Sequence, residues 1–407
     1  MSRKMAPVEE QLFVLMSGVD YGDEQLRRVF EQELRERLEE DRPLRVYLGV
    51  DPTGSSLTLG HTVPLRKLRQ FQEFGHHTIF LIGDYTALIG DPSDKNKLRP
   101  MLTPEEVRRN EATYFDQVAR FLDPSRTEIR HNSEWLAELR LYDLIQLTSK
   151  FTVAEMLRRE TFRKRFEEGD AIYLHEFLYA LMQGYDAYAL ACDVQIGGTE
   201  QLFNLMAGRK IQEAAGQRPH VPITLPILVG TDGKTKMSKS AGNYIAIDDP
   251  PEEQYGKVMS LPDEVLPDYF VLATNLDRAL VMEIVEGLRR GTRNPLEEKK
   301  RLARTIVSEC WGPEAAERAE RHFERTIQRK EAPEEMPVAY VTGEEPLLEV
   351  LVREGLASSK REARRLFQQG AVNVNGETVD ADARALPESI VQVGKRRWLR
   401  LARTPSS

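Results

Sequence analysis

Cysteine is almost absent from this chain, which has only Cys192 and Cys310 among its 407 residues. Two cysteines so far apart in sequence exclude a disulfide framework or a cysteine-rich metal cluster, and their scarcity fits a reducing compartment. Apolar runs of about 18 residues are also missing, so no transmembrane helix is expected. The first residues, MSRKMAPVEEQLF, lack the apolar stretch of a secretory signal. Together these absences predict a cytoplasmic protein.

Acidic residues outnumber basic ones over most of the chain, whose formal net charge is −8. An acidic balance argues against nucleic-acid binding by the surface as a whole. Residues 341–407 are the exception, because Lys and Arg outnumber Asp and Glu there. A basic segment at the end of an acidic chain predicts a local contact with RNA. The length of the chain allows roughly two to four domains.

A strand–turn–helix unit at residues 44–68 is the first informative segment. The apolar run 44–50 predicts a buried strand, a turn follows, and Gly60-His61 leads into an amphipathic helix. The first N–H groups of a helix lack internal partners, so such a unit can bind an anion. Pro64 is expected in the first turn of this helix. The alternative is an ordinary strand-to-helix connection that carries a surface histidine.

A second segment, residues 231–243, reads TDGKTKMSKSAGN and has the composition of a mobile loop. It carries Lys234, Lys236 and Lys239 among small polar residues. Three lysines on a flexible loop can neutralise the charge that develops on a polyphosphate during a reaction. Taken alone, such a segment is usually a solvated surface loop.

Apolar runs that alternate with helical patterns predict a Rossmann-like α/β fold with a doubly wound parallel sheet. After the first strand, the apolar runs lie at 77–84, 128–130, 192–199 and 222–229. Between the first two of these the chain is expected to become polar and then helical, at 103–122. Ligands of such sheets bind beyond the carboxyl ends of the strands. Tyr47, Asp51 and residues 84–91 are expected at that edge.

A polar stripe interrupts the apolar helical segment HEFLYALMQGYDAYAL. Tyr179, Gln183 and Asp186 are spaced at i, i+4 and i+7, which places them on one face of the helix. Buried polar side chains need hydrogen-bond partners or a ligand. The stripe therefore predicts either a ligand contact or a satisfied hydrogen-bond network within the core.

The strand–turn–helix unit and the lysine segment together resemble the signature motifs of the class I aminoacyl-tRNA synthetases. The HIGH motif is Thr58-Leu59-Gly60-His61 here, and the KMSKS motif is present unchanged at 236–240. Thr58 takes the place of the first histidine and offers a hydroxyl group without charge. The segments YLGVDPT…GHTVPL, LIGDP, YALMQGYD, QIGGTEQLFN and KMSKS, in this order, resemble the bacterial tyrosyl-tRNA synthetases over essentially the whole chain.

This resemblance implies roles for individual residues. The residues implied to bind tyrosine are Tyr47 and Asp186 at the phenolic hydroxyl, Asp91, Tyr179 and Gln183 at the ammonium group, and also Gln195 and Gln201. The residues implied to line the ATP site are Gly49, Asp51, Gly60, His61, Gly198, Glu200, Met237 and Lys239. The residues implied to act on the phosphates are Thr53, Thr58, His61, Lys95, Arg99, Lys236 and Lys239. Glu200 stands where many relatives have Asp, and its longer side chain still allows a hydrogen bond to ribose.

The resemblance also implies how the chain is divided. The expected parts are a Rossmann-like catalytic domain at 1–231 with an inserted dimerisation segment at about 101–190, the KMSKS loop and a helical anticodon-side domain at 232–330, a linker at 331–342, and a small α+β domain at 343–407. The composition of the linker supports that boundary.

The last of these parts resembles the S4-like RNA-binding domains. Its sequence predicts two helices joined through Ser358-Ser359, followed by a strand and a tight turn at Asn375-Gly376. The second helix carries a basic cluster formed by Lys360, Arg361, Arg364 and Arg365. This cluster would contact the phosphates and sugars of RNA. The alternative is a charged, solvated helix face.

The implied activity is that of a tyrosine–tRNA ligase. The tyrosine carboxylate attacks the α-phosphorus of ATP, and the tyrosyl group then passes to the terminal ribose of tRNA-Tyr. Because the substrate supplies the nucleophile, catalysis requires positioning and charge stabilisation but no Ser, Cys or His base. The resemblance further implies Mg²⁺ accompanying ATP, a homodimer and no membrane partner. The alternatives are a tryptophanyl-tRNA synthetase, a related nucleotidyl-transferring synthetase such as a pantothenate synthetase, and a non-catalytic RNA-binding paralogue.

Overall fold

A computed structural model describes most of the chain, namely residues 5–93, 101–239, 241–328, 336–343, 345–394 and 397–403. Lys95, Arg99 and residues 331–335 of the expected linker lie outside these ranges. The chain forms two compact units. The first comprises Met1–Pro250 and Lys257–Gly312, and the second comprises Pro251–Gly256 and Pro313–Ser407. The domain boundaries expected from the sequence remain predictions.

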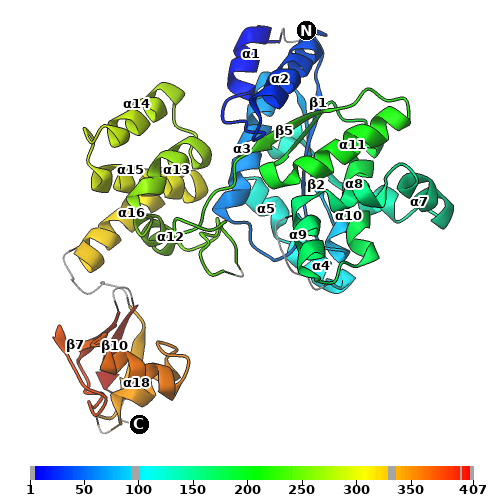
Figure 1. The fold of residues 1–407 in the computed structure, drawn as a ribbon. Helices are drawn as coiled ribbons and strands as arrows, with labels where there is room; N and C mark the ends of the chain where they lie inside the picture. The colour runs from blue at the N-terminus through cyan, green and yellow to red at the C-terminus, as the bar shows by residue number, and fades with distance from the viewer. Residues whose placement is uncertain are drawn as a thin grey trace. The chain divides into compact units, whose positions relative to one another are not determined.

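A five-stranded sheet forms the centre of the first unit (Figure 1). Its strands are β1 (Arg45–Val50), β2 (His77–Ile82), β3 (Thr127–His131), β4 (Val194–Gly198) and β5 (Val221–Leu225). They lie in the order β3-β2-β1-β4-β5, and every neighbouring pair is parallel. This confirms the predicted Rossmann-like class. The direction of winding reverses between β1 and β4, which is where doubly wound sheets bind their ligands.

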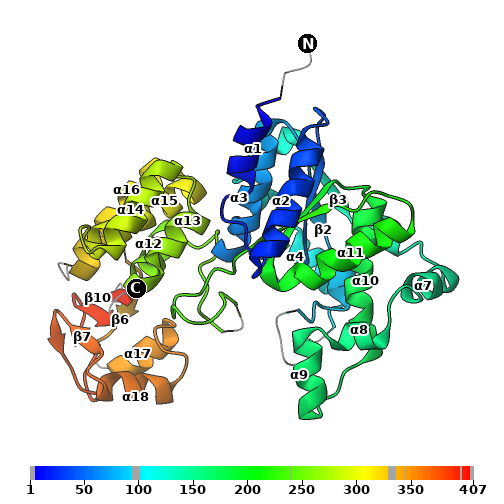
Figure 2. The ribbon, with the colours of Figure 1, turned by 45° about the horizontal axis from the view of Figure 1, so that its top comes forward.

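Helices cover both faces of this sheet. In both ribbon views α3 (Leu59–Phe74) lies on one side, and α10 (Leu174–Ala189) and α11 (Leu202–Ala214) lie on the other (Figures 1 and 2). The α10 side contains a buried cluster made of Tyr47, Ile79, Leu81, Ala187, Leu190 and Cys192. Because successive side chains of a strand point to opposite faces, the alternate residues of β1 and β2 face away from α10.

Short helices occupy the connections before and between these strands. They are α1 (Val8–Leu15), α2 (Glu24–Leu38), η1 (Thr86–Leu88), α4 (Pro104–Glu111), α5 (Tyr114–Val118), η2 (Pro124–Arg126), α6 (Ser133–Leu136), α7 (Leu141–Thr148), α8 (Val153–Leu157), α9 (Glu160–Glu168) and η3 (Thr199–Gln201). The helical character expected over 103–122 is confirmed, and it takes the form of two helices, α4 and α5. Thr103 caps the first of them by accepting the Glu106 N–H at 3.3 Å.

Strand β5 is shorter than the apolar run 222–229 predicts. It ends at Leu225, and Pro226 follows, which lacks the N–H needed to continue a ladder. The helical expectation for the next segment is confirmed, because α12 (Pro251–Met259), η4 (Asp263–Val265), α13 (Leu266–Ala273), α14 (Arg278–Arg289) and α15 (Pro295–Trp311) follow. A largely buried ion pair between Arg66 of α3 and Glu309 of α15, 2.6 Å long, joins this helical segment to the sheet layer.

The second unit has a small sheet and its own core. Its elements are α16 (Pro313–Phe323), the π-helix η5 (Glu324–Gln328), β6 (Val338–Val341), α17 (Leu347–Arg353), α18 (Lys360–Gln368), β7 (Val372–Val374), β8 (Glu377–Thr378), β9 (Ile390–Val393) and β10 (Arg397–Arg403). The strands lie in the order β6-β10-β9-β7-β8. Asn375 and Gly376 both have positive φ, +53° and +90°, which confirms the predicted tight turn.

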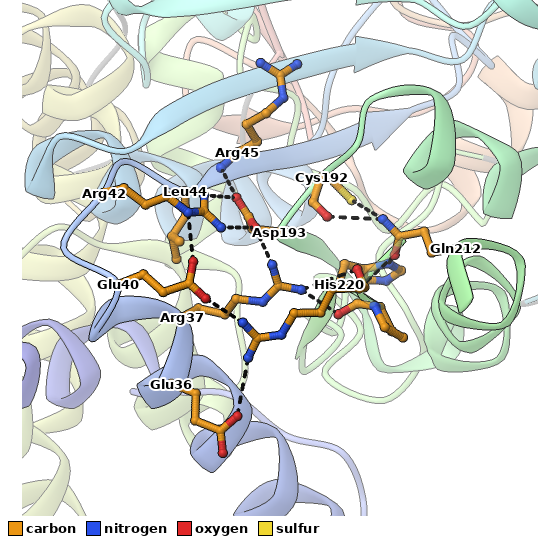
Figure 3. A network of polar contacts seen from close by, with 12 residues as sticks. Glu36, Arg37, Glu40, Arg42, Leu44, Arg45, Cys192, Asp193, Gln212 and His220 are labelled. Atoms are coloured by element: carbon orange, nitrogen blue, oxygen red, sulfur yellow. Dashed lines mark hydrogen bonds and ion pairs between the residues drawn. The ribbon is translucent and has the colours of Figure 1, made fainter. Parts of the chain in front are cut away.

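A buried ion-pair network closes the amino ends of β1 and β4 (Figure 3). Asp193, just before β4, accepts hydrogen bonds from Arg37 of α2, from two nitrogens of Arg42 at 2.7 Å each, and from the Arg45 N–H at 2.9 Å. Burial alone would raise the pKa of Asp193, but these donors and positive charges hold it below its usual value. The network therefore ties α2 to the edge of the sheet opposite the ligand edge.

None of the helices in the described ranges is long and apolar enough to cross a membrane.

Candidate active site

A cavity of about 500 Å³ opens where β1 and β4 end. The structure brings to it every predicted tyrosine, ATP and phosphate residue that it describes. These are Tyr47, Gly49, Asp51, Thr53, Thr58, Gly60, His61, Asp91, Tyr179, Gln183, Asp186, Gln195, Gly198, Glu200, Gln201, Lys236, Met237 and Lys239. Lys95 and Arg99 are outside the described residues. The polar stripe of α10 faces this cavity, as its helical spacing predicts.

Tyr47 and Asp186 provide two buried polar groups at one part of the cavity. The Tyr47 hydroxyl has no hydrogen-bond partner within the described residues, although the side chain is fully buried. Asp186 is only 2% exposed, and burial raises the pKa of its carboxyl well above the usual value. Its charge in turn adds to the burial that raises the pKa of Tyr47. Two buried polar groups that line the same cavity are suited to a ligand that carries a hydroxyl.

Two residues that the sequence did not single out hold Asp186 in place. Trp135 donates its Nε1–H to Asp186 Oδ1 at 2.8 Å, and Asn132 donates its side-chain N–H to Oδ2 at 3.2 Å. Both donors are neutral, so they offset the effect of burial on the pKa only in part. One feature of the sequence could have identified Asn132: it follows directly after β3, at the ligand edge of the sheet.

A second group of polar residues surrounds Asp91. Ser93 donates its N–H and its hydroxyl to Asp91 Oδ1, at 2.9 and 2.6 Å. Gln201 donates its amide to the other carboxylate oxygen, Oδ2. A carboxylate has about four lone-pair positions, so it retains the capacity to accept a hydrogen bond from a cation.

Tyr179 contacts the carboxylate of Asp51. Its hydroxyl donates to Asp51 Oδ2 at 2.9 Å, and the Thr86 hydroxyl donates to Asp51 Oδ1 at 2.7 Å. Asp51 leaves so little space that a Cβ on Gly83 would lie 2.1 Å from its Oδ1 atom. A glycine is therefore required at position 83 for this carboxylate to lie against the backbone.

Thr58 and His61 form the cap of helix α3. The Thr58 N–H donates to His61 Nδ1 at 3.1 Å, and the Thr58 hydroxyl lies 2.8 Å from the same atom. Because Nδ1 accepts, the ring proton is placed on Nε2. Burial, with the charges of Lys236 and Lys239, lowers the pKa of His61 to about 4. His61 is therefore a neutral donor at pH 7, and the Thr58 hydroxyl contacts the Nδ1 atom of His61.

The position predicted for Pro64 is wrong. Helix α3 begins at Leu59, so Pro64 lies inside the helix in its second turn and not in the first. A proline there lacks the N–H that would bond the carbonyl of Gly60 four residues earlier. The helix nevertheless continues to Phe74, since its apolar face is buried along its length.

The lysine segment lies against the cavity. Lys236 forms an ion pair with Glu200 through Nζ and Oε1, 2.9 Å apart. Lys239 lies over Gly54, where an added Cβ would come within 2.8 Å of its Nζ atom. Burial lowers the pKa of Lys239, against the raising effect of Asp248. Two cationic groups thus reach the cavity from one short segment.

Asn243, which the sequence did not single out, holds this segment together. Its Oδ1 accepts the Ser238 N–H at 2.9 Å, and its carbonyl accepts the Thr231 N–H at 2.8 Å. Its amide donates to Asp232 at 3.1 Å. Asp232 itself accepts from the N–H groups of Lys234 and Thr235, which closes a turn. In this structure the lysines therefore lie on a turn that is held by several hydrogen bonds.

The basic cluster of the second unit lies on the exposed face of α18. Ser359 caps this helix by accepting the Glu362 N–H at 3.2 Å. The apolar side of α18 is buried, while Lys360, Arg361, Arg364 and Arg365 remain exposed. Lys360 forms an ion pair with Glu349 at 2.6 Å. Exposed cations of this kind suit contacts with the phosphates of a nucleic acid, and such contacts do not depend on the nucleotide sequence.

Comparison with known proteins agrees with the fold and the site. The family model described as tRNA synthetases class I (W and Y) matches residues 39–328. A crystal structure of tyrosyl-tRNA synthetase from Archaeoglobus fulgidus, complexed with L-tyrosine, has a TM-score of 0.61 and 26% identity, covering 77% of this chain and all of that one. The chain belongs to the class I tRNA synthetases for tryptophan and tyrosine.

Matches over nearly the full length of the chain show which of these two amino acids its relatives use. The model for the tyrosine–tRNA ligase SYY-like C-terminal domain matches residues 328–395. The tyrosine–tRNA ligase of Thermotoga maritima is 48% identical over 401 residues, covering 97% of this chain and 98% of the relative. That of Symbiobacterium thermophilum is 46% identical over 412 residues, covering 98% and 99%. Within its class, the chain belongs with the tyrosine–tRNA ligases.

Proposed function

We propose that the cavity binds tyrosine around Tyr47 and Asp186 and ATP around the start of α3. As a tyrosine–tRNA ligase, the chain activates L-tyrosine with ATP and transfers it to tRNA-Tyr. The observation that carries the proposed placement is the pair formed by Asp186 and Tyr47, a buried carboxylate beside a hydroxyl that has no partner within the described residues. A phenolic hydroxyl would donate to the first and accept from the second.

The first step is attack of the tyrosine carboxylate on the α-phosphorus of ATP. It forms a new carboxylate–phosphorus bond and releases pyrophosphate, so the enzyme need not supply a nucleophile. Asp91 and Gln183 would hold the ammonium group, and Gln201 would lie toward the carboxylate. Catalysis then consists of alignment and stabilisation of charge on the phosphates.

The groups near α3 suit that charge stabilisation. His61 would donate from Nε2 as a neutral imidazole, and the positive end of the α3 dipole would add to it. Lys236 and Lys239 would pair with the departing pyrophosphate. The ion pair of Lys236 with Glu200 would open when Glu200 takes up its proposed contact with the ribose.

Selection against phenylalanine would follow from the same two buried groups. Phenylalanine would fill the space but leave Asp186 and Tyr47 without their partner, and an unmade buried hydrogen bond is costly. Tyrosyl-tRNA synthetases are themselves the standard example of this effect. The proposal therefore requires no editing site.

We propose that Mg²⁺ enters as part of the ATP substrate. Within the described residues no group of three His, Cys, Asp or Glu side chains is placed to hold a metal ion. Mg²⁺ commonly keeps several waters and binds through substrate phosphates, which fits a site of this composition. The two buried free cysteines, Cys192 and Cys310, are consistent with the proposed cytoplasmic location.

The second unit is proposed to bind tRNA through the basic face of α18. Deleting residues 338–407 should leave tyrosine-dependent pyrophosphate exchange within about twofold of the full chain. The same deletion should lower kcat/KM for tRNA charging at least about tenfold, because phosphate contacts are lost. Equal loss in both assays would mean that the unit supports the fold instead.

The inserted segment is proposed to form a homodimer interface. Its helices expose large apolar side chains, Leu141, Tyr142 and Ile145 on α7, Val153 on α8 and Leu174 on α10. Exposed apolar patches of this kind mark interaction surfaces. Sedimentation equilibrium would test the proposal, with Leu141→Asp expected to yield monomers.

The decisive test of the function is pyrophosphate exchange into ATP with each amino acid singly and without tRNA. Exchange with tyrosine alone is expected. Exchange with tryptophan instead would assign the chain to the other amino acid of its class. Absence of exchange with every amino acid, in a protein that still binds tRNA, would favour the RNA-binding paralogue.

A further inference from the structure

Asn204 lies directly behind the residues that line the cavity. It sits in the first turn of α11 and is 0% exposed. Its side-chain Nδ2 lies 2.8 Å from Gln183 Oε1, 2.9 Å from Gln201 Oε1 and 3.2 Å from Ser93 Oγ. An amide nitrogen has two hydrogens, so three acceptors share two donors. One side chain thereby joins three elements of the site: the end of the LIGDP segment, α10 and η3.

Ser93 connects Asn204 to Asp91 through hydrogen bonds. The Ser93 oxygen accepts hydrogen bonds from Asn204 and from the buried guanidinium of Arg159. A hydroxyl has two lone pairs and one proton, so both lone pairs are used and the proton must point elsewhere. It points to Asp91 Oδ1 at 2.6 Å. Asn204 thus helps to fix which way the serine donates, and with it the orientation of the carboxylate.

Gln212, two turns further along α11, shows what a purely structural amide looks like in the same helix (Figure 3). It is also 0% exposed. Its amide donates to the carbonyls of Ala187 and Cys192, at 3.2 Å each, and its oxygen accepts the His220 N–H at 2.8 Å. Those partners are mainly backbone groups. Within the described residues, each side-chain hydrogen bond of Asn204 goes instead to a side chain in or next to the cavity.

We infer that Asn204 is a positioning residue for the amino-acid end of the substrate: it holds Gln183, Gln201 and, through Ser93, Asp91 in the arrangement that receives the ammonium and carboxylate groups of tyrosine. This inference rests on the proposed function of the cavity. It assigns Asn204 no contact with substrate. The phenol end, held by Asp186 with Trp135 and Asn132, belongs to a separate set of hydrogen bonds.

Because separate hydrogen-bond networks hold the two ends of the tyrosine site, a change at Asn204 should have a specific kinetic signature. Asn204→Ala should raise KM for tyrosine about tenfold in pyrophosphate exchange, while KM for ATP changes less than about twofold. The preference for tyrosine over phenylalanine should stay within about twofold of the wild type, because both amino acids present the same ammonium and carboxylate. Tyramine, which keeps the amino group and the phenol, should inhibit the variant less strongly than the wild type.

Two further variants keep the test decisive. Asn204→Asp preserves the size of the side chain but removes the amide donor, so it should raise KM for tyrosine as well. Gln212→Ala removes a buried amide of the same helix and should lower the unfolding midpoint in urea without a selective change in KM for tyrosine. Circular dichroism and urea unfolding would compare the folded state of all three variants.

Each result decides for or against the inference. A folded Asn204→Ala or Asn204→Asp enzyme with wild-type KM for tyrosine would overturn it. So would equal rises in KM for tyrosine and ATP that match those of Gln212→Ala, since they would show a general structural role. Failure of the wild-type chain itself to exchange pyrophosphate with tyrosine would instead overturn the proposed function.

Discussion

Two buried aspartates at opposite edges of the same sheet have opposite surroundings. Asp186, near the end of α10, is 2% exposed, and Asp193, just before β4, is 5% exposed. Asp193 is surrounded by Arg37, Arg42 and a backbone N–H, which keep the pKa of its carboxyl low in spite of burial. Asp186 has two neutral donors, and burial keeps its pKa high. The two carboxylates are equally buried but not equally satisfied.

The difference separates a carboxylate that serves the fold from one that is suited to a ligand. A buried charge is costly unless charged partners and hydrogen bonds compensate it. At Asp193 the compensation comes from the chain itself. At Asp186 the chain supplies only two neutral donors, and the proposed ligand hydroxyl would add a third.

The largest expected effect is on stability, from Asp193→Ala. This change leaves Arg37 buried beside the vacated position, and breaking a buried pair in this way typically costs about 3–5 kcal/mol. Urea unfolding at pH 7.5 should show that loss. KM for tyrosine of the folded enzyme should change less than about twofold, because the network lies at the opposite edge of the sheet from the cavity.

The pH dependence gives a control for this effect. The pKa of Asp193 is lowered on folding, so its contribution to the free energy of unfolding is present above the unfolded value of about 4 and is lost as pH falls through the folded value. The stability difference between the wild type and Asp193→Asn should therefore shrink in acid. A difference independent of pH would contradict the ion-pair explanation.

The second effect is on selectivity, from Asp186→Asn. Losing the carboxylate that is proposed to accept from the phenol should lower discrimination between tyrosine and phenylalanine by about 1.5–3 kcal/mol, which is roughly 10- to 150-fold in the ratio of kcat/KM. Pyrophosphate exchange with both amino acids measures it. Unchanged discrimination would remove Asp186 from this role.

Stability should respond to this second change in the opposite sense from the first. Because folding raises the pKa of Asp186, its ionisation opposes folding above the unfolded value of about 4. Without ligand, Asp186→Asn should therefore be at least as stable as the wild type in urea at pH 7.5, and its relative stability should increase as pH rises from about 4. A clear destabilisation by Asp186→Asn would break the distinction between the two aspartates.

The smallest effect is expected from Trp135→Phe. This variant keeps an aromatic ring under Arg130, whose guanidinium carbon lies 5.4 Å from the ring centroid, and removes only the Nε1–H donor to Asp186. KM for tyrosine should rise about 3- to 10-fold, consistent with the roughly 0.5–1.5 kcal/mol of one lost hydrogen bond. A larger loss than that of Asp186→Asn would show that Trp135 acts through packing.

Local patterns in the sequence predicted much of this fold. The strands β1, β2 and β4 follow from short apolar runs bounded by turn residues, and the polar stripe Tyr179, Gln183 and Asp186 follows from helical spacing. Local patterns misplaced Pro64, which lies in the second turn of α3, and they missed that Pro226 follows the last residue of β5. The helical stretch expected at 103–122 is present, although its charge pattern did not reveal the break after Glu111.

The residues missed at the site share a physical reason. Asn132, Trp135 and Asn204 form hydrogen bonds with residues far away in sequence, whereas Asn243 bonds within its own loop and has no periodic pattern that marks it. No spacing rule links Asn204 to Ser93 or Trp135 to Asp186, since only the packing of α10, α11 and the sheet brings these atoms together. An isolated Asn or Trp carries no local signal of such a role.

The sequence by itself determined the periodicity of each element, the motifs of the anion-binding turn and the lysine segment, and hence the family. Those properties depend on residues close together along the chain. Only the tertiary structure decided which of two buried aspartates is neutralised by arginines and which remains under-satisfied in a cavity. That outcome depends on desolvation and on partners supplied by distant segments, and both arise only when the chain has packed.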